Sequence, residues 1–285
     1  MKANYFTKVS LGCLLCLLVV VAGCCINIGC CGWNRAKYER EVQLSAPLAA
    51  GSLFAAETHN GSIAVTGADV TDCNVIATIK ARAASEEEAK ELAEKVKVKL
   101  EPFGNKLAVK IEKPAFMTNK SVSVNLNVTV PEHSDLELTT HNGAIRIANI
   151  TGGVNGTTHN GKVIAEQVSG GTELRSHNGR ITCEEISGDV KLKTHNGRIN
   201  AAYSPNASPV CSVSLITHNG GIEFTAPPNF SAAVEASTHN GSIKTELPIA
   251  VTVVGKISKR KLTGTIGTGE GKLYLETYNG SIKIR

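Results

Sequence analysis

Hydrophobic and polar residues alternate along most of the chain after residue 50, and one short turn motif interrupts the alternation at intervals. The motif is Thr/Ser-His-Asn-Gly. Its copies centre on His59, His141, His159, His177, His195, His218 and His239, and Tyr278 replaces the histidine in a last copy. Four consecutive copies, from His141 to His195, are spaced by 18 residues. A fixed period with the same turn chemistry indicates stacked structural units, so we expect a repeat fold.

Superposing the 18-residue repeats aligns aliphatic residues such as Val163, Ile181 and Ile199. Because side chains alternate along a strand, the Thr and Asn of each motif are predicted to point inward with these aliphatic residues, and the histidines outward. An inward Asn in every unit predicts a ladder of paired amides, since buried amides need partners. The predicted ladder is Asn60, Asn142, Asn160, Asn178, Asn196, Asn219, Asn240 and Asn279.

Two architectures agree with this alternation. Asn-Gly is a strong hairpin signal, which would give an antiparallel meander. The alternative is a solenoid whose coils stack at about 4.8 Å. A meander gives no reason for identity at every eighteenth residue, whereas a solenoid does, because equivalent residues of successive coils touch. We therefore predict an all-β solenoid over residues 51–285.

A different segment, residues 69–132, interrupts the repeat near its start. Val75 to Ala81 is predicted as a strand, and Ser85 is predicted to cap one short helix that ends near Val96. A hairpin is expected around Phe103-Gly-Asn-Lys, and a strictly alternating strand begins at Ser121. The insert is therefore predicted to consist of strands, one helix and a hairpin.

The first 31 residues are a separate segment, with a basic start and an apolar run from Val9 to Val21. Val21-Ala22-Gly23-Cys24 resembles a bacterial lipobox, which would make Cys24 the lipidated first residue of an exported lipoprotein. The alternative is an uncleaved membrane helix of roughly 20 residues from Val9 to about Ile28. In either case the body is expected to be exported and anchored in a bacterial cell envelope, with residues 32–50 as a tether.

Composition adds two constraints. Aromatic residues make up only 4% of the chain, which favours narrow β-layers over a thick core. The net charge of +5 is mild and of mixed sign, so nucleic acid is not an expected partner. Outside the N-terminal segment the cysteines are Cys73, Cys183 and Cys211. An odd number predicts no complete disulfide framework, and Cys183 is expected to be a small core residue.

The repeated Thr-x-Asn-Gly-x-Ile pattern, the single early helix and the ending from Leu262 to Ile284 resemble the bacterial "putative adhesin" β-strand-repeat domains grouped under the name Toastrack. The resemblance covers roughly residues 50–285. It implies a right-handed single-stranded parallel β-helix with coils of about 18 residues. It implies no activity, and it does not explain why the variable motif position is His in seven copies.

The outward histidines suggest two kinds of binding site. Adjacent imidazoles of His141, His159, His177 and His195 would suit Zn²⁺, Cu²⁺ or Ni²⁺, but the sequence offers no convergent third ligand. The second candidate is a polyanion surface built from Arg175, Arg180, Lys193 and Arg198, which are interleaved with acidic residues. The alternative to both is a structural row in which the rings stack on one another.

No catalytic set or phosphate-binding loop is evident, and no cofactor is expected. We therefore expect a non-enzymatic, membrane-tethered envelope solenoid with an adhesin-like, scaffold or stress-associated surface and an unidentified envelope partner. The alternative function is a module that binds divalent transition metals or acidic polymers.

Overall fold

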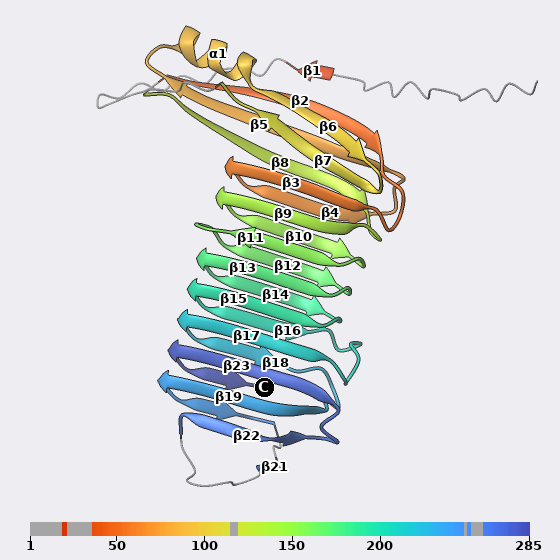
Figure 1. Cartoon of the computed structure of the whole chain (residues 1–285), viewed down its shortest axis with the longest axis vertical. Helices are drawn as coiled ribbons and strands as arrows, with labels where there is room; N and C mark the ends of the chain where they lie inside the picture. Colours follow the sequence, from red (N-terminus) through yellow and green to blue (C-terminus); the bar gives the residue numbers. More distant parts are fainter. Residues whose placement is uncertain (1–18, 22–35, 115–118, 248–249, 252–258) are drawn as a thin grey trace, which may run out of the picture.

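The computed structural model describes residues 19–21, 36–114, 119–247, 250–251 and 259–285. Its main body is a solenoid in which each coil contributes one strand to each of two twelve-stranded sheets (Figure 1). We call the sheet whose strands end in the motif the motif sheet, and the other the return sheet. Neighbouring coils pair in parallel and in register. The predicted all-β solenoid is confirmed, and the meander is excluded.

The two sheets are built from short strands of similar length. Coil strands of the motif sheet are β3 (Leu53–Asn60), β9 (Asp135–Asn142), β11 (Val154–Thr158), β13 (Thr172–Asn178), β15 (Val190–Asn196), β17 (Ser212–Asn219), β23 (Gly271–Asn279) and β19 (Ala232–Asn240). Those of the return sheet are β4 (Ile63–Ala68), β10 (Ile145–Ile150), β12 (Val163–Val168), β14 (Ile181–Ile186), β16 (Ile199–Tyr203), β18 (Ile222–Thr225), β24 (Ile282–Ile284) and β20 (Ile243–Thr245).

The last coil does not lie at the end of the stack. Strands β23 and β24 lie between the β17–β18 coil and the β19–β20 coil, so the chain skips one place and then returns to fill it. Beyond β19 the motif sheet ends in the antiparallel strands β22 (Lys261–Ile266) and β21 (Ala250–Val251). Antiparallel pairing therefore closes this end of the motif sheet.

The other end is closed by the segment that precedes and interrupts the repeats. It contains β1 (Val19–Val21), β2 (Ala36–Pro47), β5 (Asp72–Ala83), α1 (Glu86–Lys95), β6 (Lys97–Phe103), β7 (Lys106–Glu112) and β8 (Ser121–Pro131). The N-cap Ser85 accepts a hydrogen bond from the backbone N–H of Glu88, and β6 and β7 form the expected hairpin. The predicted helix and hairpin are confirmed.

The prediction of a tether over residues 32–50 is wrong for the part that the structure describes. Strand β2 pairs with β5 along its whole length, and it buries Val42, Leu44 and Ala46. Lys37, Glu39 and Glu41 occupy outward positions of this strand, whereas Arg40 lies on the inward face and donates to the Ala93 carbonyl at 3.3 Å. The mixed charge of the segment therefore did not reveal a strand with one buried face.

The core is a narrow aliphatic layer between the two sheets. Its largest fully buried side chains include Phe54, Phe224 and Leu174. Cys183 is fully buried as expected, and burial raises the pKa of its thiol to about 12. Cys73, Cys183 and Cys211 are all free thiols, which agrees with the absence of a disulfide framework among the residues that the structure describes.

Cys24 and most of the predicted signal or anchor segment lie outside the described residues. Within the described ranges, no helix combines the length and apolar character needed to cross a membrane.

Candidate functional site

The threonine or serine of each motif ties neighbouring coils together. These side chains are buried, and each hydroxyl from the second motif onward donates a hydrogen bond to the carbonyl of the motif glycine in the adjacent coil. Thr158 donates to Gly143 at 2.9 Å, and Ser176 donates to Gly161 at 3.0 Å. The inward direction predicted for these residues is confirmed, and their hydroxyls satisfy carbonyls that the turn leaves without a strand partner.

The glycine of each motif is required by the close approach of the coils. A Cβ atom on Gly179 would lie 1.9 Å from the carbonyl oxygen of Gly161. On each of the other motif glycines it would lie 1.8–2.0 Å from a backbone carbonyl oxygen of the adjacent strand or coil, which is that of Val124 for Gly61 and that of a motif glycine elsewhere. Only Gly61 among the motif glycines has a positive φ. The motif Asn-Gly therefore forms no left-handed hairpin turn, and its glycine is a spacing requirement.

The predicted asparagine ladder is present, but it lies at the surface. Each side-chain Nδ2 donates to the Oδ1 of the adjacent coil at 2.8–2.9 Å, in the order 60, 142, 160, 178, 196, 219, 279, 240. Asn60 is half-buried and the others are exposed. The inward direction predicted for Asn is wrong, because the alternation of buried and exposed residues ends at the Thr, and both the His and the Asn at the end of the strand are exposed.

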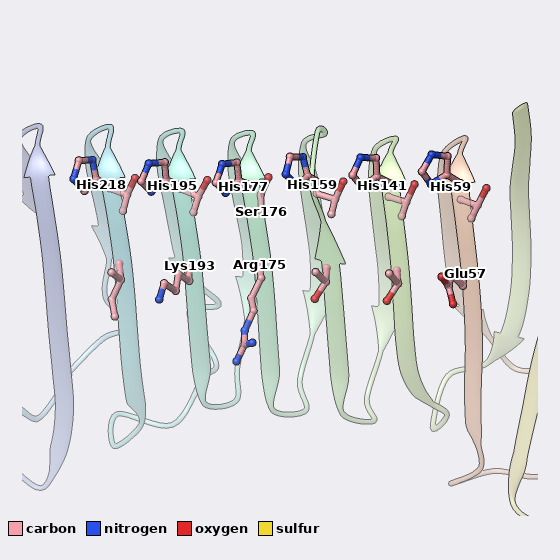
Figure 2. Close-up of a pocket in the computed structure, with 18 of the residues that line it drawn as sticks. Glu57, His59, His141, His159, Arg175, Ser176, His177, Lys193, His195 and His218 are labelled. Carbon is pink, nitrogen blue, oxygen red and sulfur yellow. The ribbon is translucent and has the colours of Figure 1, made fainter. Parts of the chain in front are cut away.

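The histidines form one continuous row of stacked rings, which we call the ring row. In spatial order it contains His59, His141, His159, His177, His195, His218, Tyr278 and His239, with centroids 4.5–5.0 Å apart. Neighbouring ring planes differ by only 5–20°. Figure 2 shows the labelled rings beside the turns, all pointing the same way. The side chains are exposed, so the predicted outward direction is confirmed.

This stacking works against a shared metal ion. The lone pair of an imidazole nitrogen lies in the ring plane, so a metal must lie in the plane of every ring that binds it. The planes of His159 and His177 differ by 17° with centroids 4.7 Å apart, so the two rings cannot share an ion without rotating. Among the described residues, no group of three or more His, Cys, Asp and Glu side chains is arranged to hold a metal.

A shallow groove of about 860 Å³ runs beside the ring row on the outer face of the motif sheet. Its second wall comes from the residues two positions before each ring, which we call the flanking row: Glu57, Thr139, Thr157, Arg175, Lys193, Ile216 and Glu276. They follow one another across the coils in this order, because they are paired in register. Five of these residues, all except Arg175 and Lys193, were not predicted from the sequence, although their constant place two positions before the ring puts them on the same strand face.

The four basic residues predicted to form one polyanion surface are divided between two surfaces. Arg175 and Lys193 line the groove (Figure 2). Arg180 and Arg198 follow the motif glycine at the start of return-sheet strands, and they do not line it. The prediction of a single surface is wrong, because the turn between these residues carries the chain from one sheet to the other.

The eighth histidine, His133, lies at the opposite corner. Its Nδ1 lies 2.5 Å from Oγ1 of Thr151, and its Nε2 lies 3.5 Å from a carboxylate oxygen of Glu132. The Thr151 hydroxyl has a backbone acceptor of its own, the Glu132 carbonyl at 3.0 Å. This trio of residues is a corner contact and no catalytic set.

Two single changes in one turn measure what the exposed ladders contribute. We expect Asn178→Ala to lower the free energy of unfolding by about 1 kcal/mol, since two amide hydrogen bonds are lost and their partners can bond to water. His177→Ala should cost no more than about 0.5 kcal/mol, because its ring is exposed. Urea unfolding followed by circular dichroism measures both. A larger loss at His177 would show that ring stacking stabilises the turns more than the amides do.

Comparison with known proteins identifies a family for this chain. The model of the family Toastrack DUF4097 matches residues 54–285. Three solved structures are similar: a "putative cell adhesion protein" from Clostridium sporogenes (13% identity, 85% of this chain and 97% of that chain, TM-score 0.35), a "putative adhesin" from Bacteroides fragilis (11%, 86% and 97%, 0.37) and a "putative lipid binding protein" from Parabacteroides distasonis (11%, 87% and 96%, 0.36). No curated protein matches the sequence. Because the family model covers most of the chain, this protein belongs to the Toastrack DUF4097 family.

Proposed function

We propose that this protein is a non-enzymatic solenoid, exported and tethered to the bacterial cell envelope by its N-terminus, that presents a repetitive recognition surface. The observation that carries the proposal is the uninterrupted ring row beside an open groove. Each coil offers an aromatic ring at the same place, an imidazole in every coil except that of Tyr278, so the surface is suited to a partner that is itself extended or repetitive. Such a surface serves adhesion or scaffolding, in which several weak contacts act together.

The titratable side chains of the described residues support the non-enzymatic part of the proposal. Catalysis usually depends on titratable groups that their surroundings tune to a task. Burial raises the pKa of the side chains of Cys73, Cys183 and Tyr203, and a hydrogen bond to Glu276 raises the pKa of Tyr274. None of them lines the groove. The groove is therefore better suited to holding a partner than to activating one.

Recognition through the ring row is tested by measuring how much bacterial envelope material the immobilised protein retains. Beads that carry the purified full chain are compared with beads that carry the triple variant His159→Ala/His177→Ala/His195→Ala. We expect the wild-type beads to retain bacterial envelope fragments and the variant beads to retain several-fold less, because the three changes remove consecutive rings. Equal retention by a variant with an unchanged circular dichroism spectrum would contradict the proposal.

The tether is tested by mass and by fractionation. If Cys24 is the lipid site, the wild-type protein lacks residues 1–23, carries acyl groups and sediments with membranes. Cys24→Ala should then leave the precursor uncleaved and unacylated. Stable anchoring needs more than one acyl chain, at about 0.8 kcal/mol per buried methylene. A wild-type protein that retains Met1 would establish the uncleaved membrane helix instead.

A further inference from the structure

The groove runs along the stack of coils, across the strands, because each coil contributes one residue to each of its two walls. Within the groove, the ring row and the flanking row both run along the stack from the β3 coil to the β23 coil. A compact ligand would touch only one or two coils. An extended chain laid along the groove contacts every coil with the same geometry, at a repeat of 4.7–5.0 Å between His141 and His218.

The rings offer their edges to such a chain. The two faces of His159 are covered by His141 and His177, and the same holds for the other inner members of the row. The exposed edge of an imidazole carries its two nitrogens, which donate and accept hydrogen bonds. The ring row therefore suits a ligand with polar groups along its length, and its inner rings have no free face for stacking on sugars or bases.

Charge along the groove changes sign in an ordered way. The middle of the flanking row carries Arg175 and Lys193, whereas Glu57 and Glu276 lie at its two ends. Thr139 and Thr157 add hydroxyls between Glu57 and Arg175. Lys193 has no carboxylate partner within the described ranges. The groove is thus positive and hydroxyl-lined at its centre and negative at its ends.

The residues two positions before Arg175 and Lys193 on the same strands, Glu173 and Lys191, leave the centre of the groove positive. Glu173 pairs with both Arg175 and Lys191, the latter at 3.3 Å. The hydrogen bond from Arg175 lowers the pKa of Glu173, so this carboxylate stays charged. Together with Lys193, these residues place three cations around one carboxylate. An anionic ligand over these coils therefore meets a net positive field.

We propose that this groove binds a segment of an extended acidic polymer, whose phosphate or carboxylate groups contact Arg175 and Lys193 and whose polar groups bond to the ring edges. Glu57 and Glu276 repel the polymer beyond the central coils and so limit the bound segment. The inference rests on the proposed function, since it names the chemistry that the same surface recognises. It also excludes Arg180 and Arg198 from the site.

Binding of defined polymers to the full chain in nonionic detergent tests the inference. The probes are long-chain polyphosphate, polygalacturonate and neutral dextran of similar length, measured by isothermal titration. We expect at least one acidic polymer to bind, with affinity that falls steeply as salt is added, because bound cationic side chains release counterions from the polymer. Dextran should not bind. Preference for one acidic probe identifies phosphate or carboxylate as the recognised group. Binding of neither acidic probe, or equal binding of dextran, would overturn the inference.

Matched charge changes locate the site. Arg175→Gln/Lys193→Gln should weaken binding of the acidic polymer at least about tenfold and reduce its salt dependence. Arg180→Gln/Arg198→Gln removes the same charge from the other side of the turn and should change affinity less than about twofold. Equal losses in the two double variants would show a general charge effect and no groove site.

A gain of affinity provides a test that damage to the fold cannot imitate. Glu57→Gln/Glu276→Gln removes both end carboxylates and should strengthen binding about threefold or more. Unchanged or weaker binding would contradict the role of the glutamates in limiting the segment. If the acidic polymers fail while envelope fragments are still retained through the ring row, this inference is wrong and the proposed function stands.

Discussion

Replacing Gly179 with alanine is expected to lower the free energy of unfolding by about 3 kcal/mol or more. The new Cβ would lie 1.9 Å from the carbonyl oxygen of Gly161 and 2.6 Å from its carbonyl carbon. Both atoms belong to backbone that is held by hydrogen bonds, so the two coils must separate. Separation weakens the hydrogen bond from Ser176 to Gly161, the amide bond from Asn178 to Asn160 and the stacking of His177 on His159. Urea unfolding of the variant measures the loss.

Gly171 is the matched control for this change. It lies in the opposite corner, its φ is not positive, and a Cβ there would meet nothing within 4 Å. Gly171→Ala should therefore change the free energy of unfolding by less than about 1 kcal/mol in either direction. If Gly179→Ala were tolerated equally well, the coils would be able to separate at little cost, and the motif glycine would need another explanation.

The substitution Leu174→Ala is expected to lower the free energy of unfolding by about 3 to 5 kcal/mol. This side chain is fully buried, and in the neighbouring coil the equivalent position is Gly156, whose missing side chain leaves room that Leu174 fills. Because Gly156 offers no side chain to move into the space, Leu174→Ala should leave a cavity that collapses poorly. The change in the urea midpoint measures the effect.

A conservative substitution separates the cavity from other causes. Leu174→Met keeps nearly the same volume and should cost less than about 1.5 kcal/mol. If Met and Ala cost the same, loss of volume would not be the reason for the destabilisation. An Ala cost below about 2 kcal/mol would show that the thin core between the two sheets relaxes around the gap.

The face on which a motif residue lies can be predicted by alternation only as far as the regular strand extends. Period-two alternation correctly assigned the buried Thr158 and the exposed His159, because both lie on or next to the regular strand. It failed for Asn160, since the chain has already turned there. The same limit explains why Arg175 and Arg180 were placed on one surface, although they flank a turn that joins two sheets.

The backbone bend near the end of each return-sheet strand could not be predicted from the residue types found there. Asn149, Gln167 and Glu185 occupy equivalent places at the end of return-sheet strands, and all have positive φ values of 53–58°. Positive φ is unusual for Gln and Glu, so no local signal marks these positions. The solenoid imposes the bend, because Ile150, Val168 and Ile186 must return to the core after it.

The sequence by itself determined the features that depend on local chemistry repeated at a constant spacing. These were the solenoid with its 18-residue coils, the capped helix, the hairpin, the outward histidines and the amide ladder. Only the tertiary structure decided the order of the coils, in which Tyr278 lies between His218 and His239. It also decided that β2 joins the return sheet, and that Glu57 and Glu276 lie at opposite ends of the groove. The physical reason is that strand pairing joins residues far apart in the sequence, and equivalent repeats pair equally well with more than one neighbour.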